Sequence, residues 1–373
     1  MINKEKISAF QFRTLVIFFT IGTTIINVPS YMAIEAKQDA WIGAALGVAL
    51  GLIIIWFYTK LGLLFPRMTF VEMNRALFGK WIGNTLSLFF LLLPFLYGSE
   101  LLYYLGSFMS IEIFPETPVA AIHFLMVVIV IMGVRLGLET IIRSSEIFIV
   151  FFFILFIILV AFITPQIKLE NLQPVFEADV KSLLRGAFIF IDFSTATAVI
   201  LLMIFPASVN QPKAAAKSFI VGYLIGGFVM IVIIFLNISV LGVDNTARHL
   251  YPTYILARKI NIGHFIQRME AVLAIMWILS IYVKMSMYLY VVALGIGQIL
   301  NLKDHRPLVL PLGGISLALS LVMFSNIIEQ QNWDKEISIF FSYTVGFLLP
   351  LIMFCIVMLR KMVQKRKNKT NSL

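Results

Sequence analysis

The chain has 373 residues, of which 60% are hydrophobic and only 13% are charged. Soluble domains carry about 25% charged residues, so this composition excludes a water-soluble globular protein. The net charge of +10 does not indicate nucleic-acid binding, because most of the cations gather between apolar segments, where they set membrane topology. The sequence therefore predicts an all-α protein that crosses a membrane many times.

Ten apolar segments are long enough to cross a bilayer, which takes about 20 residues for a helix. The predicted spans are 10–34, 41–64, 83–109, 118–135, 144–164, 183–205, 216–241, 268–298, 308–328 and 337–359. Connections rich in helix breakers, such as "FPETP" and "TPQIKLENLQP", separate them. The basic start "MINKEKISAF" is not followed by a small-residue cleavage site, so we expect the first span to be retained.

The Lys and Arg residues lie mostly on one side of the membrane if the N-terminus is cytoplasmic. The positive-inside rule then predicts that both termini are cytoplasmic. Trp41 and Trp333 would lie at the outer interface and Trp81 at the inner one. The outer loop 242–267 is basic and does not fit this rule, and its stretch "YILARKINIGHFIQRME" predicts a short helix on the membrane surface. The basic tail is expected to contact lipid headgroups.

The first span contains the stretch "IGTTIINVPS", residues 21–30, among Leu, Ile, Val and Phe. Its polar and helix-breaking residues predict an interruption of the helix: Gly22, Thr23, Thr24, Asn27 and Pro29. Gly22 permits the break, and Pro29 limits the hydrogen bonding of the turn before it. The two Thr hydroxyls and the Asn amide then satisfy part of the freed backbone. A break at this depth predicts a binding site.

Small residues and polar clusters recur in equivalent positions of the two halves of the chain. The second span carries Gly43, Gly47 and Gly51, and the seventh carries Gly222 and Gly226, spacings that let helices approach closely. The first and sixth spans carry the polar clusters "GTTIIN" and "IDFSTAT". Paired interruptions of this kind are typical of transporters with inverted repeats. We therefore expect two five-helix repeats, 1–182 and 183–361, and a basic tail, 362–373.

Three ionisable residues fall near the middle of their spans: Glu100, Asp192 and Lys284. A charge at the bilayer centre costs at least about 2.5–3.5 kcal/mol, so each should face a cavity or a partner. Lys284 lies about 16 residues beyond Arg268, roughly 24 Å along a helix, too deep to snorkel easily. Lys284 either replaces a coupling ion or contacts an anionic ligand group, or it is a structural partner for Asp192, Glu100 or backbone carbonyls.

The two carboxylates also have alternative roles. One role for Asp192 is to contact a ligand amine or to bind a proton. The other is that it lies hydrated near the outer mouth. Glu100 lines a cavity or makes a polar contact between helices. Glu270 is expected to form an interface pair at the outer end of its span.

Motifs of enzymes and cofactor proteins are missing from the sequence. It has no Walker A loop and no HExxH, and its four His residues are scattered over loops and span ends. Cys355 is the single cysteine, which excludes an intrachain disulfide and CxxC chemistry. We expect no metal, no cofactor and no catalytic activity.

Several motifs together resemble a known family. They are "IGTTIINVPS", "FGKWIGNTLSL", "ETP" before the fourth span, "YPT" at 251–253, "RMEAVLAIMWI" and "YVKMSMYLY" around Lys284. With them the chain resembles, over essentially its whole length, the B subunits of the nutrient germinant receptors of bacterial endospores. This is the spore germination permease family of the amino acid–polyamine–organocation superfamily. Some members carry Gly-x-Glu late in the sixth span, where this chain reads Ala198-Val199-Ile200.

The resemblance implies a LeuT-like five-plus-five inverted repeat with broken helices 1 and 6. It also implies a sensor of a small nutrient, usually an amino acid and sometimes a sugar or nucleoside. The implied partners are a larger A subunit and a lipoprotein C subunit, and the implied location is the inner membrane of the spore. A proton-coupled amino acid symporter of the same fold and a purely structural scaffold are the alternatives.

The freed N–H groups at the start of the second half of span 1 would carry partial positive charge and suit a carboxylate. The predicted ligand-binding residues are Gly22, Thr23, Thr24, Asn27, Tyr97, Gly98, Leu101, Asp192, Val283 and Lys284. Hydroxyls and amines also bind sugars and nucleosides, so this set does not name the ligand.

Overall fold

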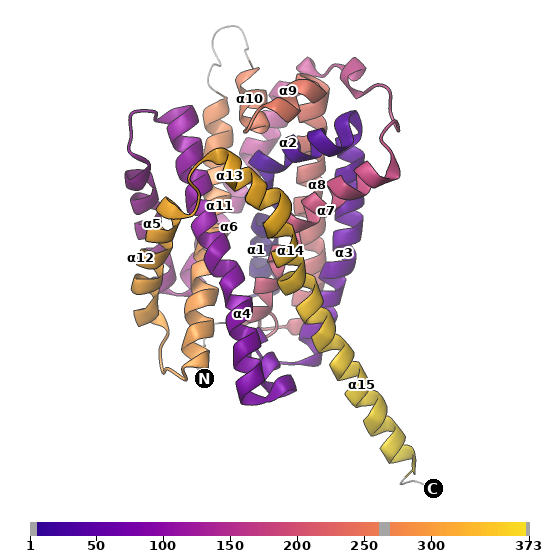
Figure 1. The fold of residues 1–373 in the computed structure, drawn as a ribbon, viewed down its shortest axis with the longest axis vertical. Coiled ribbons are helices and arrows are strands. Elements are labelled where there is room, and N and C mark those ends of the chain that lie inside the picture. The colour runs from indigo at the N-terminus through magenta and orange to yellow at the C-terminus, as the bar shows by residue number, and fades with distance from the viewer. Residues whose placement is uncertain (1–5, 261–268, 371–373) are drawn as a thin grey trace.

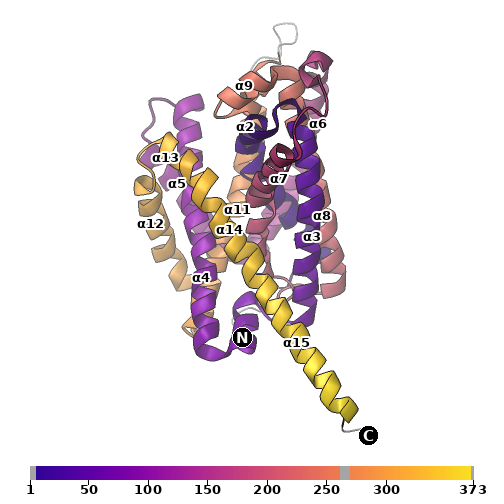
Figure 2. The ribbon, with the colours of Figure 1, turned by 45° about the vertical axis from the view of Figure 1, so that its right-hand side comes forward.

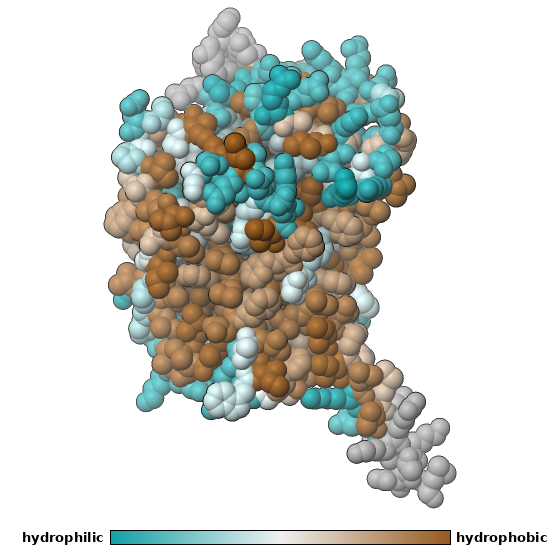
Figure 3. Space-filling view, in the orientation of Figure 1, coloured by the Kyte–Doolittle hydropathy of each residue, from teal (hydrophilic) through white to brown (hydrophobic). Residues whose placement is uncertain are grey.

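The computed structural model describes residues 6–260 and 269–370, which are nearly all helical. The helices form an upright bundle, and α15 leaves its lower end as a projecting rod (Figures 1 and 2). On the face shown in Figure 3, hydrophobic side chains form a broad band across the bundle, and hydrophilic ones gather at the upper end and along the lower rim. This distribution fits a protein surrounded by lipid along most of its height.

The first half of the chain contributes six α-helices. They are α1 (Ala9–Ile21), α2 (Thr24–Ala36), α3 (Ala40–Leu64), α4 (Phe70–Phe108), α5 (Val119–Leu136) and α6 (Leu138–Ile163). Short helical turns, η1 (Lys37–Asp39) and η2 (Met109–Ile113), follow α2 and α4. Non-helical backbone at Gly79, with φ of 79°, divides α4 into a short lower part and a long membrane part.

The second half is less regular. It contains α7 (Val180–Ser194), η5 (Ala196–Met203), α8 (Pro212–Leu241), α11 (Glu270–Ile299) and α12 (Arg306–Val322). The last apolar segment is a continuous series of α13 (Ile327–Asn332), η6 (Trp333–Ile337), α14 (Ser338–Tyr343), η7 (Thr344–Leu348) and α15 (Leu349–Thr370). Two short helices, α9 (Val243–Arg248) and α10 (Pro252–Arg258), cover the upper end (Figure 1).

Among the described residues, eight helical stretches are long and apolar enough to cross a membrane, and two shorter apolar helices are Ala9–Ile21 and Arg306–Val322. Length and composition thus confirm several apolar helices but not the predicted count of ten. Residues 261–268, which include Arg268 and part of the predicted surface helix, lie outside the described residues. The described part of that loop forms α9 and α10.

The predicted start of the last span at residue 337 is wrong. The helix begins at Ile327, where the Asn326 side chain accepts a hydrogen bond from the Glu329 N–H at 2.9 Å. The charged stretch "WDKE", interpreted as a loop, continues this helix because the Asp334 carboxylate is buried among hydrogen-bond donors. At the other end, residues 362–370, expected as a separate tail, continue α15.

The two glycine series allow pairs of helices to touch. Gly43 and Gly47 of α3 lie against α7, Gly51 lies against Tyr223 of α8, and Gly222 and Gly226 of α8 lie against α1. A Cβ atom on Gly47 would lie 2.9 Å from the Phe190 Cβ, and one on Gly222 would lie 2.8 Å from the Arg13 carbonyl oxygen. The second predicted span therefore packs on the sixth, and the seventh packs on the first, as two inverted repeats require. The division at residues 182 and 183 stays a prediction.

Candidate functional site

Two interrupted segments meet inside the bundle. The helix α1 ends at Ile21, and the N–H of Gly22 donates to the Phe18 carbonyl at 2.8 Å. The next helix, α2, begins at Thr24 without a side-chain cap, so its first N–H groups point towards the interruption. In the second half of the chain, α7 ends at Ser194 and the backbone continues as the 3₁₀ helix η5. Both interruptions free backbone groups for other contacts.

Lys284 of α11 connects the two interruptions. Its ammonium donates to the Phe193 carbonyl at 3.2 Å and to the Thr23 hydroxyl at 3.5 Å. It also lies 5.7 Å from the centre of the Phe19 ring, a cation–π distance. The side chain is only 2% exposed, and its acceptors are a carbonyl and a hydroxyl rather than a carboxylate. Lys284 is therefore a buried cation that holds both broken segments.

Gly22 makes room for this lysine. A Cβ atom at residue 22 would lie 2.8 Å from the Lys284 Cδ and 3.2 Å from the Phe18 carbonyl oxygen. The first distance is well inside van der Waals contact, so a larger residue would displace the lysine stem. The glycine therefore allows α1 and α11 to approach each other closely.

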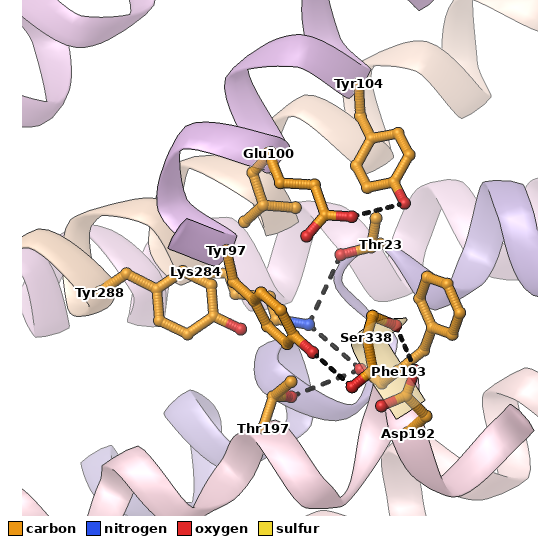
Figure 4. A pocket seen from close by; sticks show the side chains of 11 residues that line it. Thr23, Tyr97, Glu100, Tyr104, Asp192, Phe193, Thr197, Lys284, Tyr288 and Ser338 are labelled. Carbon is orange, nitrogen blue, oxygen red and sulfur yellow. Dashed lines mark hydrogen bonds between the residues drawn. The ribbon is translucent and has the colours of Figure 1, made fainter. Parts of the chain in front are cut away.

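A small cavity lies around the Lys284 ammonium (Figure 4). Its lining residues are Thr23, Tyr97, Glu100, Leu101, Tyr104, Asp192, Phe193, Thr197, Lys284, Tyr288 and Ser338. Its volume is about 30 Å³, which is enough for one or two water molecules. A nutrient-sized molecule would fit only after the surrounding segments move apart.

The carboxylates around this cavity are held by hydroxyl groups. Asp192 accepts hydrogen bonds from Ser338, at 3.0 Å, and from Ser342. Tyr97, another lining residue, donates to the Ser338 carbonyl at 3.0 Å. Glu100 is 5% exposed and lies 3.1 Å from the Tyr104 hydroxyl. The cavity therefore carries both an ammonium and carboxyl groups, a combination that suits a zwitterionic molecule.

The predicted ligand-binding residues divide into two groups. Five of them line the cavity: Thr23, Tyr97, Leu101, Asp192 and Lys284. The other five do not line it: Gly22, which packs on Lys284, and Thr24, Asn27, Gly98 and Val283. Gly98 lines a separate cavity between α4, α5, α11 and α12. Pro29 lies inside α2, well past the interruption.

Sequence reasoning missed five polar residues at or next to the cavity: Tyr104, Thr197, Tyr288, Asp334 and Ser338. Tyr104 and Tyr288 follow Glu100 and Lys284 by four residues, a spacing that places side chains on one helix face. This signal was present in the sequence. Asp334 could not be found in the same way, because the predicted start of its helix, residue 337, lies beyond it. Ser338 fell inside the predicted span, where a single hydroxyl gives no signal.

The sequence profile of the spore germination protein family matches residues 6–333. This chain belongs to the spore germination protein family. The chain is 26% identical to spore germination protein KB of Bacillus subtilis over 374 residues, which cover 99% of the chain and 98% of that relative. The family predicted from the motifs is confirmed.

Solved structures with the same fold are LeuT-like transporters. MhsT, in complex with L-phenylalanine, matches with a TM-score of 0.69 and 14% identity, over 95% of this chain and 99% of MhsT. Mhp1, a nucleobase–cation symporter with bromovinylhydantoin bound, matches with a TM-score of 0.67 and 12% identity, over 94% and 78% of the two chains. These likenesses confirm the all-helical LeuT-like fold of this spore germination protein.

Proposed function

We propose that this protein is the nutrient-sensing subunit of a spore germination receptor and that it binds a small nutrient, an amino acid in the first place, at mid-membrane. The single observation that supports it most is the buried Lys284 ammonium in a cavity between two helix interruptions. A protein of the germination family that holds a buried ammonium next to carboxyl groups has the chemistry to bind a small polar molecule.

The ligand carboxylate would approach Lys284 and the first N–H groups of α2, with Thr23, Thr24 and Asn27 nearby. The ligand ammonium would approach Asp192 and Glu100. The wall of the cavity would be formed or supported by Tyr97, Gly98, Leu101 and Val283. Because the cavity holds only about 30 Å³, binding favours an expanded packing of the bundle. A ligand shifts such an equilibrium only by its difference in affinity for the two packings.

The shift would be passed to partner subunits, a larger A subunit and a lipoprotein C subunit. The protein would act in the inner spore membrane with both termini in the cytoplasm, without a cofactor and without catalysing a reaction. Its two repeats, 1–182 and 183–361, would together enclose the cavity.

A proton-coupled amino acid transporter is the second candidate. It is favoured by the fold, because MhsT and Mhp1 are matched over most of this chain. A transporter would move the same ligand through the protein, so the cavity does not distinguish the two functions. Uptake of amino acids by the purified protein alone in liposomes would establish transport.

The decisive experiment is a nutrient screen with spores whose only receptor contains this subunit. We expect germination in response to one nutrient class and no response when the gene is deleted. The same strain carrying Lys284→Met should respond weakly although the protein is present. Responses to every nutrient that are unchanged by the deletion would refute the sensor function.

A further inference from the structure

Five buried polar residues form a cluster beside the cavity, which we name the roof cluster: Tyr31, Glu100, Tyr104, Gln330 and Asp334. Each is 5% exposed or less. The Asp334 carboxylate accepts hydrogen bonds from Tyr31 at 2.7 Å, from Tyr104 at 2.6 Å, and from the Gln330 amide. The Gln330 amide also donates to the Tyr104 oxygen at 3.0 Å.

The roof cluster joins three segments that are far apart in the sequence. Tyr31 comes from α2, Glu100 and Tyr104 come from α4, and Gln330 and Asp334 come from α13 and η6. Both α2 and α13 lie towards the upper end of the bundle (Figure 1). The Tyr31 ring lies 5.8 Å from the ring of Phe193, which lines the cavity together with Glu100 and Tyr104. The cluster therefore lies between the cavity and the upper end.

The hydrogen-bond geometry assigns a proton within the cluster. A phenol has one O–H proton to donate, and Tyr104 lies 2.6 Å from both Asp334 oxygens but 3.1 Å from the Glu100 Oε1. If the Tyr104 proton is donated to Asp334, an ionised Glu100 would face only oxygen lone pairs at Tyr104. A protonated Glu100 would instead donate to the Tyr104 oxygen or to the neighbouring Asp334 carboxylate. Asp334, which has several donors, is then the ionised carboxylate.

The charged and titratable neighbours are consistent with this assignment. On the cavity side, Asp192 and Lys284 face Glu100 from α7 and α11, and Tyr97 faces it from its own helix. On the upper side, the Lys335 ammonium lies 5.8 Å from the centre of the Tyr31 ring. Two ionised carboxylates at the cluster would repel each other in a low-dielectric environment, and a single proton on Glu100 removes that repulsion.

We propose that the roof cluster is a latch that closes the cavity towards the upper end and that Glu100 carries a proton while the latch is closed. Separation of α2 from η6 breaks the Tyr31–Asp334 bond, and separation of α4 from η6 breaks the Tyr104–Asp334 bond. Entry from this side requires at least one of these separations. The latch controls access to the cavity for whichever small molecule enters, and it does not depend on the sensor function.

Thiol accessibility in the purified full-length protein in nanodiscs tests the latch. The single cysteine is replaced by Cys355→Ser, and Thr197→Cys places one thiol in the cavity wall. The rate of labelling by a charged methanethiosulfonate reagent is then measured with and without Tyr31→Phe and Tyr104→Phe together. We expect these two substitutions to raise the rate at least tenfold. An unchanged rate would overturn the latch.

Tyr58→Phe is the matched control, because it removes a buried hydroxyl that donates to the Gly346 carbonyl and not to the roof cluster. We expect it to change the labelling rate less than twofold. An increase equal to that of the roof variants would mean general loosening and would overturn the latch. Labelling after denaturation gives the total thiol for each variant, and Tyr31→Phe alone is the milder variant if the double one does not fold.

A pair of isosteric variants tests the proton. Glu100→Gln keeps a donor towards Tyr104, so we expect labelling within threefold of the parent. Asp334→Asn removes the ionised acceptor, so we expect at least a tenfold increase. The reverse order, or equal increases, would overturn the assignment. Infrared spectroscopy gives a second readout: the wild-type minus Glu100→Gln difference should contain a carboxylic-acid C=O band, and a carboxylate band in its place would also overturn it.

Discussion

The variant Gly22→Ala tests the contact between the first helix interruption and Lys284. The new methyl group would lie 2.8 Å from the Lys284 Cδ, so the lysine stem must move. Its ammonium then loses the 3.2 Å bond to the Phe193 carbonyl. A hydrogen bond from a charged donor contributes about 1.5–3 kcal/mol. Because each 1.4 kcal/mol is a factor of ten in affinity, the nutrient concentration for half-maximal germination should rise roughly 10- to 150-fold.

The assay is the fall in absorbance of spores whose only receptor carries the variant, with the protein level measured by immunoblot. Gly314→Ala is the matched control, because a Cβ at Gly314 would meet none of the described residues within 4 Å. We expect that control to leave the nutrient response unchanged. A Gly22→Ala dose response equal to that of the control, at equal protein level, would refute the reasoning.

Three further predictions concern other contacts. Gly51→Ala places a Cβ 1.9 Å from the Tyr223 hydroxyl oxygen, so overpacking should reduce stability by about 1–3 kcal/mol; thermal unfolding in detergent at or above the wild-type midpoint would contradict this. Asp39→Ala removes the acceptor of two backbone N–H bonds of 2.9 Å each, and limited proteolysis should then cleave the segment 173–178 faster, whereas an unchanged cleavage rate would count against it. Lys284→Met leaves both helix interruptions without their shared donor, and we expect at least a tenfold weaker nutrient response; a normal dose response at normal protein level would show that the ammonium has no part in it.

The sequence predicted the parts of the fold that depend on local composition. Apolar length revealed the helices, and the polar stretch at residues 21–30 revealed the first interruption. Residues that the fold brings together could be predicted from the sequence only where each residue type was unusual for its own segment. Lys284 and Asp192 stand out in apolar, membrane-spanning sequence because a charge there is costly, so both were identified from the chain alone.

The roof cluster escaped prediction for a physical reason. Asp334 lies in the charged stretch "WDKE", which has the composition of a loop. Its carboxylate is accommodated inside the protein by hydroxyl and amide donors from α2, α4 and α13. No local pattern encodes partners that lie hundreds of residues away, so hydropathy placed the helix start ten residues too late. The identity of the family did not depend on this error.

The glycine contacts also determine which parts of the molecule can move independently. Because the Phe190 side chain of α7 packs directly on Gly47 of α3 and the backbone of α1 packs on Gly222 of α8, these four helices cannot slide past one another without collision. We therefore expect them to move as one unit, and expansion of the cavity would displace that unit against α4 and α11. A small separation of helices at mid-height then produces a larger displacement of the helix ends. A neighbouring subunit would therefore register an occupied cavity from the ends of the bundle, without touching the ligand.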